Sequence, residues 1–386
     1  MNDVAICEYT WRGDAGLGGE ELRAFRDLLP YCFPPGSVWR WAGTEVPVVH
    51  FTTRTPEEVR LVNARLDAVL ARTGERQRSG PARTLLDQWD AEIGGIVLDP
   101  PDIRRVGPGL DVIGPGPALL LQAVDRVAAD LAARLGASEY VVPHLVSWDT
   151  LERGGYPRTF PQHVTACAVV RPELEALDGF AAATSADERA RHLEPAPVTV
   201  SPTVCLHLFA AYAGQTLDRP VIATARQSCG RFEAGAAGVA TRLWSFTMRE
   251  IIYIGDGSGA RQFRDEMLLH LKDLIRELGL PARLTGASDP FFTIDRSQLA
   301  SYQSTWDLKQ ELCGRMREDS SSVAVSSVNL HHQHFGKSFE ITLADGKAAA
   351  STCTGFGLDR WARWLHGHLG PNPADWPAPL RRATNA

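Results

Sequence analysis

One stretch near the C-terminus decides the fold: Thr352-Cys353-Thr354-Gly355-Phe356-Gly357-Leu358-Asp359-Arg360-Trp361. Its first half alternates small polar with apolar residues and ends in glycines, which is typical of a strand that stops. Its second half opens an amphipathic helix. We therefore predict a strand that passes directly into a helix, with Arg360 in the first helical turn.

An upstream segment has a complementary form. Cys229-Gly230-Arg231-Phe232-Glu233 is followed by a loop of small residues at 234–241, and residues 243–252 then return as a strand. Two strands joined by such a loop form an antiparallel hairpin. The charged pair Arg231 and Glu233 lies just before the loop, where the side chains can reach a ligand.

Strands outnumber helices in the rest of the chain, and several follow one another without a helix between them. This order predicts an α+β fold with a largely antiparallel sheet rather than a doubly wound parallel one. Hydrophobic periodicity predicts helices at 55–74, 117–135 and 261–278 and strands at 48–52, 139–142, 198–200, 221–224, 249–254, 323–327 and 339–343.

Composition limits the classes of function. The chain has 386 residues, 44% of them hydrophobic, and a net charge of −6, so it has no general cationic footprint for nucleic acid. The N-terminus has no signal-peptide pattern, and no apolar run is long enough to span a membrane. With seven irregularly spaced cysteines, we expect a reducing, cytoplasmic location.

The two opening segments resemble motifs 2 and 3 of the class II aminoacyl-tRNA synthetases, and the helix–strand–Pro143 unit resembles motif 1. Within that class, the chain is similar to the methanogen-type, zinc-dependent seryl branch, and more so to the amino acid:[carrier protein] ligases built on the same core. Four further strings carry this likeness: Gly155-Tyr156 with Phe160-Pro161, residues 287–292, Lys309-Gln310-Glu311-Leu312, and residues 329–336. The resemblance as a whole covers residues 115–370.

The resemblance assigns an ATP site. It implies that Arg231 binds the α-phosphate, Arg360 the γ-phosphate and Glu233 the adenine amino group, and that Phe246 stacks on the base. Guanidinium groups suit this task because their planar fork matches phosphate oxygens. Catalysis would then rest on positioning and on neutralising charge, with no protein nucleophile.

The resemblance also implies a zinc ion held by Cys205, Glu250 and Cys353. Their spacing alone says nothing, since the three lie far apart in sequence. Two thiolates and a carboxylate leave a fourth position for the substrate's α-amino group, as in a catalytic site. The alternative is that Cys205 and Cys353 are buried structural thiols in strands. Cys167, Cys229 and Cys313 are interpreted as core thiols.

One expected residue is missing. In this class, an acidic side chain on the strand before motif 3 holds the Mg²⁺ ions that accompany ATP, whereas here that strand reads Val323-Ala324-Val325-Ser326-Ser327-Val328-Asn329. Glu311, Ser326 and Asn329 are possible substitutes, and we place Glu311 in the ATP site. The string His331-His332-Gln333-His334 is interpreted as a marker near the active site rather than as a second metal site.

The acceptor follows from what the N-terminal region lacks. Residues 1–112 show no sustained heptads and no basic stripe that would bind tRNA, so we expect an accessory region there and the catalytic core at 113–386. We therefore predict activation of a small amino acid, glycine or alanine, and its transfer to the phosphopantetheine thiol of a carrier protein. The alternatives are a seryl-type tRNA ligase and a non-catalytic nucleotide-binding paralogue. The resemblance further implies a C₂ homodimer.

Overall fold

The computed structural model describes residues 7–14, 17, 22, 25–26, 28–34, 37–42, 46–53, 55–74, 83–91, 102–233, 242–287, 308–316 and 322–384. The chain divides into two compact units. The first comprises Met1–Pro81 and Ser288–Thr305, and the second comprises Ala82–Ala287 and Trp306–Ala386.

The first unit is a small sheet packed against one helix. Its described elements are β1 (Cys7–Arg12), η1 (Leu29–Cys32), β2 (Trp39–Trp41), β3 (Val48–Thr53) and α2 (Pro56–Gly74). The strands pair antiparallel in the order β1-β3-β2. As predicted, α2 begins after a capping hydroxyl, because the backbone N–H of Glu58 donates to Thr55 Oγ1 at 3.2 Å. Val62 and Leu66 then turn inward to Trp11 and Phe51.

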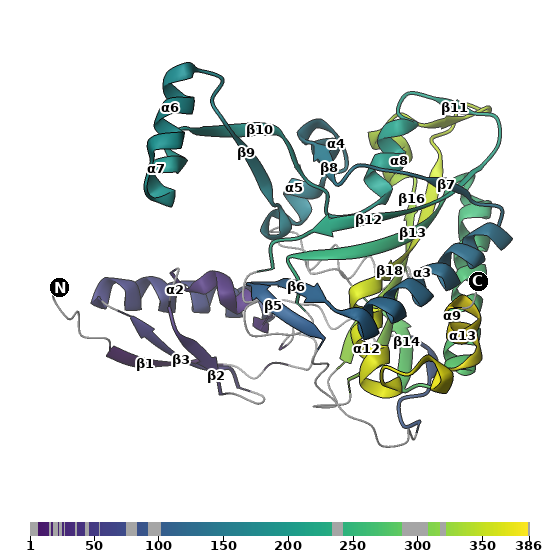
Figure 1. Ribbon diagram of the computed structural model, residues 1–386, viewed down its shortest axis with the longest axis horizontal. Helices are drawn as coiled ribbons and strands as arrows, with labels where there is room; N and C mark the ends of the chain where they lie inside the picture. The colour runs from purple at the N-terminus through teal and green to yellow at the C-terminus, as the bar shows by residue number, and fades with distance from the viewer. Residues whose placement is uncertain are drawn as a thin grey trace. The chain divides into compact units, whose positions relative to one another are not determined.

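The second unit is built on an eight-stranded sheet in the order β4-β14-β15-β16-β18-β13-β12-β7 (Figure 1). Every pair is antiparallel except β12 with β7. The sheet strands are β4 (Thr84–Asp87), β7 (Ser138–Tyr140), β12 (Val221–Gly230), β13 (Ser245–Gly255), β14 (Ala282–Gly286), β15 (Lys309–Arg315), β16 (Ser322–His332) and β18 (Ala350–Gly357). The predicted α+β class with a largely antiparallel sheet is confirmed.

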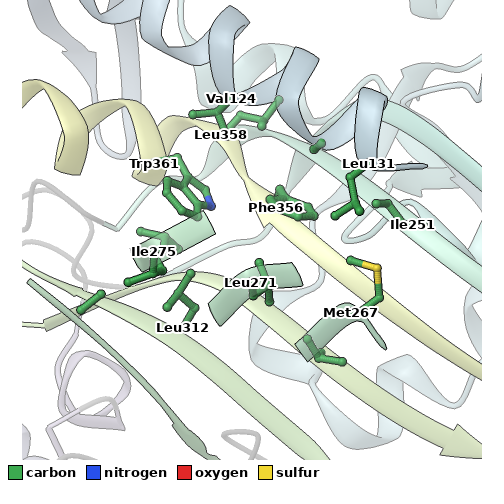
Figure 2. Close-up of a cluster of buried hydrophobic side chains, with 14 of the residues drawn as sticks. Val124, Leu131, Ile251, Met267, Leu271, Ile275, Leu312, Phe356, Leu358 and Trp361 are labelled. Carbon is green, nitrogen blue, oxygen red and sulfur yellow. The ribbon is translucent and has the colours of Figure 1, made fainter. Parts of the chain in front are cut away.

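Four helices cover one face of this sheet: α3 (Pro115–Arg134), α9 (Gly257–Leu278), α12 (Leu358–Leu369) and α13 (Ala378–Thr384). Alternate strand residues such as Ile251 and Phe356 point into them. Figure 2 shows Trp361, Leu271 and Met267 packed against this face. Burial of these apolar side chains is the main stabilising term of the unit.

The opposite face, called the polar face below, carries Glu250 beside a smaller apolar cluster that includes Ile252 and Ile254, and it is covered in part by α8 (Cys205–Ala211) and α11 (His334–Ser338). A second sheet, in the order β8-β10-β9, projects with α6 and α7 at its far end (Figure 1). The remaining elements are β5 (Ile103–Gly107), β6 (Leu110–Ile113), β8 (Leu145–Ser147), α4 (Trp148–Arg153), α5 (Tyr156–Thr159), η2 (Pro161–His163), β9 (Ala166–Val170), α6 (Leu174–Ala182), α7 (Ala186–Ala190), β10 (Leu193–Val200), β11 (Thr216–Leu217), β17 (Thr342–Leu343) and η4 (Pro373–Asp375).

Two local predictions are wrong. The strand expected at 339–343 is reduced to β17, because Phe339 ends α11 and Glu340 adopts a left-handed backbone with φ of 57°. The alternating burial of Phe339 and Ile341 comes from a turn rather than from a sheet. Cys205 does not lie in a strand either, since it is the first residue of α8.

Among the described residues, no helix combines the length and apolar character required to cross a membrane.

Candidate functional site

The polar face of the sheet brings together Cys205, Glu250 and Cys353. Glu250 belongs to β13 and Cys353 to the adjacent β18, and α8 carries Cys205 above them. The three potential ligand atoms lie within 4.8 Å of one another. All three residues are at most 5% exposed. Of the described residues, these alone form such a group of three or more.

Glu250 is held by the start of α8. Its carboxylate accepts the backbone N–H groups of Cys205 at 3.1 Å and Val204 at 3.3 Å, and it also accepts the hydroxyl of Thr203. The backbone carbonyl of Glu250 accepts the Thr224 hydroxyl at 2.8 Å. Side chain and backbone are therefore both fixed. Nothing in the sequence points to Thr203 as the partner of this carboxylate.

The electrostatics of the group favour a cation. Burial, together with the neighbouring Cys353, raises the pKa of Glu250 to about 7. The hydrogen bond between the two thiols, followed by burial, raises the pKa of Cys205, and the same hydrogen bond lowers the pKa of Cys353. Three acidic groups this close cannot all ionise without a compensating charge.

A divalent metal ion fits this donor set. Two thiolates and a carboxylate are ligands that zinc accepts, and three protein ligands leave a tetrahedral ion one open position. The hydrogen bonds from α8 orient the carboxylate, as outer contacts do in metal sites. The open fourth position is typical of a metal site that binds a substrate, and less typical of a closed structural metal site.

The predicted phosphate-binding arginines lie at the ends of neighbouring strands. Arg231 directly follows β12, and its Nε donates to the carbonyl of Pro202 at 2.9 Å. Its guanidinium lies 5.4 Å from the centre of the Phe246 ring. Pro202 belongs to the segment that leads to Cys205, so this contact ties the arginine to the group of Cys205, Glu250 and Cys353.

The other two predicted ATP residues contact each other. Arg360, in the first turn of α12, lies 3.7 Å from Glu233 Oε1 through its Nη2 atom. Its Nη1 donates to the carbonyl of Ala324 on β16 at 3.3 Å. Glu233 is only 13% exposed, so in this structure its carboxylate is occupied by the arginine.

The three possible substitutes for the missing acid have different surroundings. Glu311 pairs with Lys309 at 3.0 Å and lies opposite Ser327 in the sheet. Ser326 instead accepts the indole N–H of Trp361 at 2.9 Å within the helix-covered core. Asn329 donates to Cys353 Sγ at 3.7 Å. Glu311 is thus the one carboxylate of the three, and in this structure it is ion-paired with Lys309.

The remaining predicted strings divide between described and undescribed residues. Of the histidine string, His331 lies beside the site, with Nε2 3.6 Å from Cys353 Sγ. None of its histidines joins the group of Cys205, Glu250 and Cys353. The hairpin loop at 234–241 and most of the string at 287–292 lie outside the described residues. Cys229 is buried, whereas Cys167 and Cys313 are only partly buried.

Comparison with solved structures identifies the fold. The seryl-tRNA synthetase of M. kandleri, solved in complex with A. aeolicus tRNASec, matches 98% of this chain and 77% of its own at a TM-score of 0.65 and 19% identity. The seryl-tRNA synthetase of Pyrococcus horikoshii, solved with ATP, matches 73% of this chain at a TM-score of 0.52. The class II synthetase-type fold is therefore confirmed.

Comparison with curated sequences identifies the relatives. Type-2 serine–tRNA ligase of Methanopyrus kandleri is 23% identical over 71% of this chain, which spans 56% of that protein. Amino acid–[acyl-carrier-protein] ligase 2 of Bradyrhizobium diazoefficiens is 31% identical over 269 residues, which are 68% of this chain and 80% of the ligase. Amino acid–[acyl-carrier-protein] ligase 1 of the same organism is 30% identical over 71% of this chain and 85% of that ligase.

No family model matches the chain. The two Bradyrhizobium proteins, however, are matched over most of their length, and both are ligases. The fold beneath that match is the one on which the seryl-tRNA synthetases are built. By this evidence, the chain belongs to the family of amino acid–[acyl-carrier-protein] ligases.

Proposed function

We propose that this ligase joins an amino acid to ATP as an aminoacyl-adenylate and then transfers it to the phosphopantetheine thiol of a carrier protein. The observation that carries the proposal is the group Cys205, Glu250 and Cys353 on the sheet face next to Arg231, in a chain 31% identical to a ligase of this kind.

In the first step, a carboxylate oxygen of the amino acid attacks the α-phosphorus of ATP, and the bond to pyrophosphate breaks. Arg231 would bind the α-phosphate, where negative charge accumulates, and Arg360 would bind the departing γ-phosphate. For this, Arg360 would exchange its contact with Glu233 for phosphate, which leaves the Glu233 carboxylate to accept the adenine amino group. Phe246, already beneath Arg231, offers the ring on which adenine stacks.

In the second step, the carrier's thiol sulfur attacks the aminoacyl carbonyl and the bond to AMP breaks. Sulfur loses its proton, and the product is a thioester with AMP as the leaving group. No nucleophile of the protein is required, so the residues contribute position and charge.

Cys205, Glu250 and Cys353 would hold zinc, which when bound supplies a Lewis-acid position for the neutral α-amino group of the substrate. Through this position, Cys205, Glu250 and Cys353 would distinguish an amino acid from a plain carboxylic acid, which has no amino group to bind. Because the amino group is held close to the sheet, we infer a small substrate, glycine or alanine. Glu311 would hold the Mg²⁺ of ATP beside Ser327.

Amino-acid-dependent exchange of pyrophosphate into ATP tests the first step. A panel of amino acids, run with and without a zinc chelator, should give exchange with glycine or alanine that the chelator abolishes. The absence of exchange with every amino acid would support the alternative of a non-catalytic nucleotide-binding paralogue. Exchange that survives the chelator would show that zinc is not required for the first step.

The acceptor needs its own test because a structural neighbour was solved with tRNA. Labelled adenylate should discharge onto a purified phosphopantetheinylated carrier protein and not onto tRNA. The apo carrier, which lacks the prosthetic group, is the matched control. Charging of tRNA in a filter assay would make the seryl-type alternative correct. A C₂ homodimer, checked by light scattering, completes the proposal.

A further inference from the structure

His331 lies outside the residues to which the proposed function gives a role. It is the next-to-last residue of strand β16, beside Cys353 and outside the group of Cys205, Glu250 and Cys353. Its Nε2 is 3.6 Å from Cys353 Sγ, and its Nδ1 is 3.0 Å from the hydroxyl oxygen of Ser351. The ring therefore bridges two residues of β18.

Hydrogen-bond chemistry fixes the direction of this bridge. When Cys353 is a thiolate metal ligand it can only accept, and Nε2 then carries the proton that faces it. Nδ1 of the neutral ring is then an acceptor, and it receives the hydroxyl proton of Ser351. Ser351 is 1% exposed, so the ring nitrogen, rather than bulk water, is the partner of this hydroxyl, which can donate to Nδ1 when Nε2 carries the proton.

Packing holds the ring in place. Phe209 meets it edge-on with the ring centres 6.1 Å apart and an interplanar angle of 85°, and Phe335 does so at 4.8 Å and 78°. Phe209 lies one turn after Cys205 on α8, so the helix that carries one metal ligand also braces the partner of another.

A second donor reaches the same sulfur. Asn329, two residues earlier on β16, donates its side-chain amide to Cys353 Sγ at 3.7 Å and to Ser327 Oγ at 3.2 Å. Cys205 has a different environment: its sulfur lies 3.6 Å from the hydroxyl of Thr203, which donates its proton to Glu250. Cys353 is therefore the thiol that is surrounded by N–H donors.

We infer that His331, assisted by Asn329, is a positioning residue that stabilises Cys353 as a thiolate ligand and thereby sets the affinity of the site for zinc. The inference rests on the proposed function. Outer hydrogen bonds to metal ligands commonly change metal affinity by about 10- to 100-fold when they are removed, and the same range is expected here.

Competition for zinc between the full-length protein and a chromophoric chelator tests the inference. His331→Phe keeps the aromatic packing and removes both nitrogens, and we expect it to bind zinc about 10- to 100-fold more weakly. His331→Gln places an amide N–H near the Nε2 position and should recover most of the affinity. Ser351→Ala leaves the ring but removes the hydrogen-bond partner of Nδ1, and should give a smaller loss. His332→Asn is the control, since His332 does not contact Cys353 and Asn tolerates its φ of 49°.

Cobalt in place of zinc gives a readout that a loss of folding would not produce. Without the N–H donor, the Cys353 thiolate holds its electrons less tightly, so the sulfur-to-cobalt charge-transfer band of His331→Phe should move to longer wavelength at unchanged intensity. A change in the ligand-field bands that shows one ligand fewer would make His331 a direct ligand and overturn the inference. Unchanged zinc affinity and an unshifted band in a folded variant would also overturn it.

Pyrophosphate exchange by the wild-type protein, measured in parallel, distinguishes failure of this inference from failure of the proposed function. Exchange together with unaltered zinc affinity in His331→Phe and Ser351→Ala would sink this inference and leave the proposed function standing. Weakened zinc binding in the variants without any exchange by the wild type would do the reverse. A wild-type protein that binds no zinc overturns the inference, whatever the exchange assay shows.

Discussion

Glu250 should make the metal-free protein less stable as the pH rises. Glu250 is 2% exposed, and burial together with the neighbouring Cys353 raises the pKa of its carboxyl group from 4.5 to about 7. A group with a raised pKa in the folded state contributes stability that is complete below pH 4.5 and is lost as the pH passes 7. At about 1.4 kcal/mol per pH unit, this gap amounts to about 3 kcal/mol of the free energy of unfolding.

The measurement is urea unfolding at pH 5 and pH 8 in the presence of a metal chelator, followed by circular dichroism. Between these values the wild type should lose about 2.5 kcal/mol more than Glu250→Gln, which keeps the shape of the side chain but has no proton to lose. Glu175→Gln, at an exposed position on α6, serves as the matched control and should keep the wild-type slope.

Added zinc should reverse the trend in the wild type alone. Metal ligands must be deprotonated, so zinc binds more tightly as the pH rises and stabilises the fold in proportion. The reasoning is refuted if Glu250→Gln shows the same dependence on pH as the wild type in chelator, because the buried carboxyl would then not be the group that titrates.

Three further predictions concern the other parts of the site and its support. Arg231→Lys should lower pyrophosphate exchange by about 10²- to 10³-fold, as loss of a transition-state donor does, while zinc affinity measured by chelator competition stays unchanged. Glu311→Gln should raise the Mg²⁺ concentration that gives half-maximal exchange, and excess Mg²⁺ should restore the rate; a rate insensitive to Mg²⁺ would reassign the carboxylate. Phe356→Ala, at 1% exposure in the helix-covered core, should cost about 3–5 kcal/mol in thermal or urea unfolding, equally with zinc and with chelator.

Periodicity predicted the existence of the central strands but not their length. The strand expected at 221–224 extends to the whole of β12, past Arg226, whereas the segments expected at 243–252 and 249–254 together match β13, which runs through Arg249. Charged residues interrupt an apolar pattern, so they appear to end a strand when only the sequence is read. Here the sheet continues because Asp125 and Glu139 neutralise the arginines.

The candidate metal ligands Cys205, Glu250 and Cys353 show which groupings sequence spacing cannot reveal. Cys205 lies 45 residues before Glu250 and 148 before Cys353, so no local motif joins them. Only likeness to a family placed the three in one group, and only the structure puts Cys205 at the start of a helix. The contacts of Glu250 with Thr203 and of Cys353 with His331 depend on tertiary packing, which no single-sequence pattern encodes.

The two neighbours Arg249 and Glu250 join these observations. Successive strand residues point to opposite faces, so one charge of β13 must lie on the helix-covered side and the other on the polar side. Arg249 is 6% exposed and donates to Asp125 Oδ1 at 2.6 Å and to Glu139 at 2.8 Å. Its charge is thereby matched on the helix-covered face.

Glu250 has no comparable partner. Among the described residues its carboxylate forms no ion pair: it receives hydrogen bonds, two thiols lie within 4.8 Å, and the Arg231 guanidinium acts on it without direct contact. A buried charge that is matched on one face of a strand and unmatched on the other is costly unless a ligand supplies the missing charge. The same strand therefore explains both the rigidity of the site and its demand for a cation. That demand is the physical reason to expect zinc at Glu250 rather than a mere cluster of buried thiols.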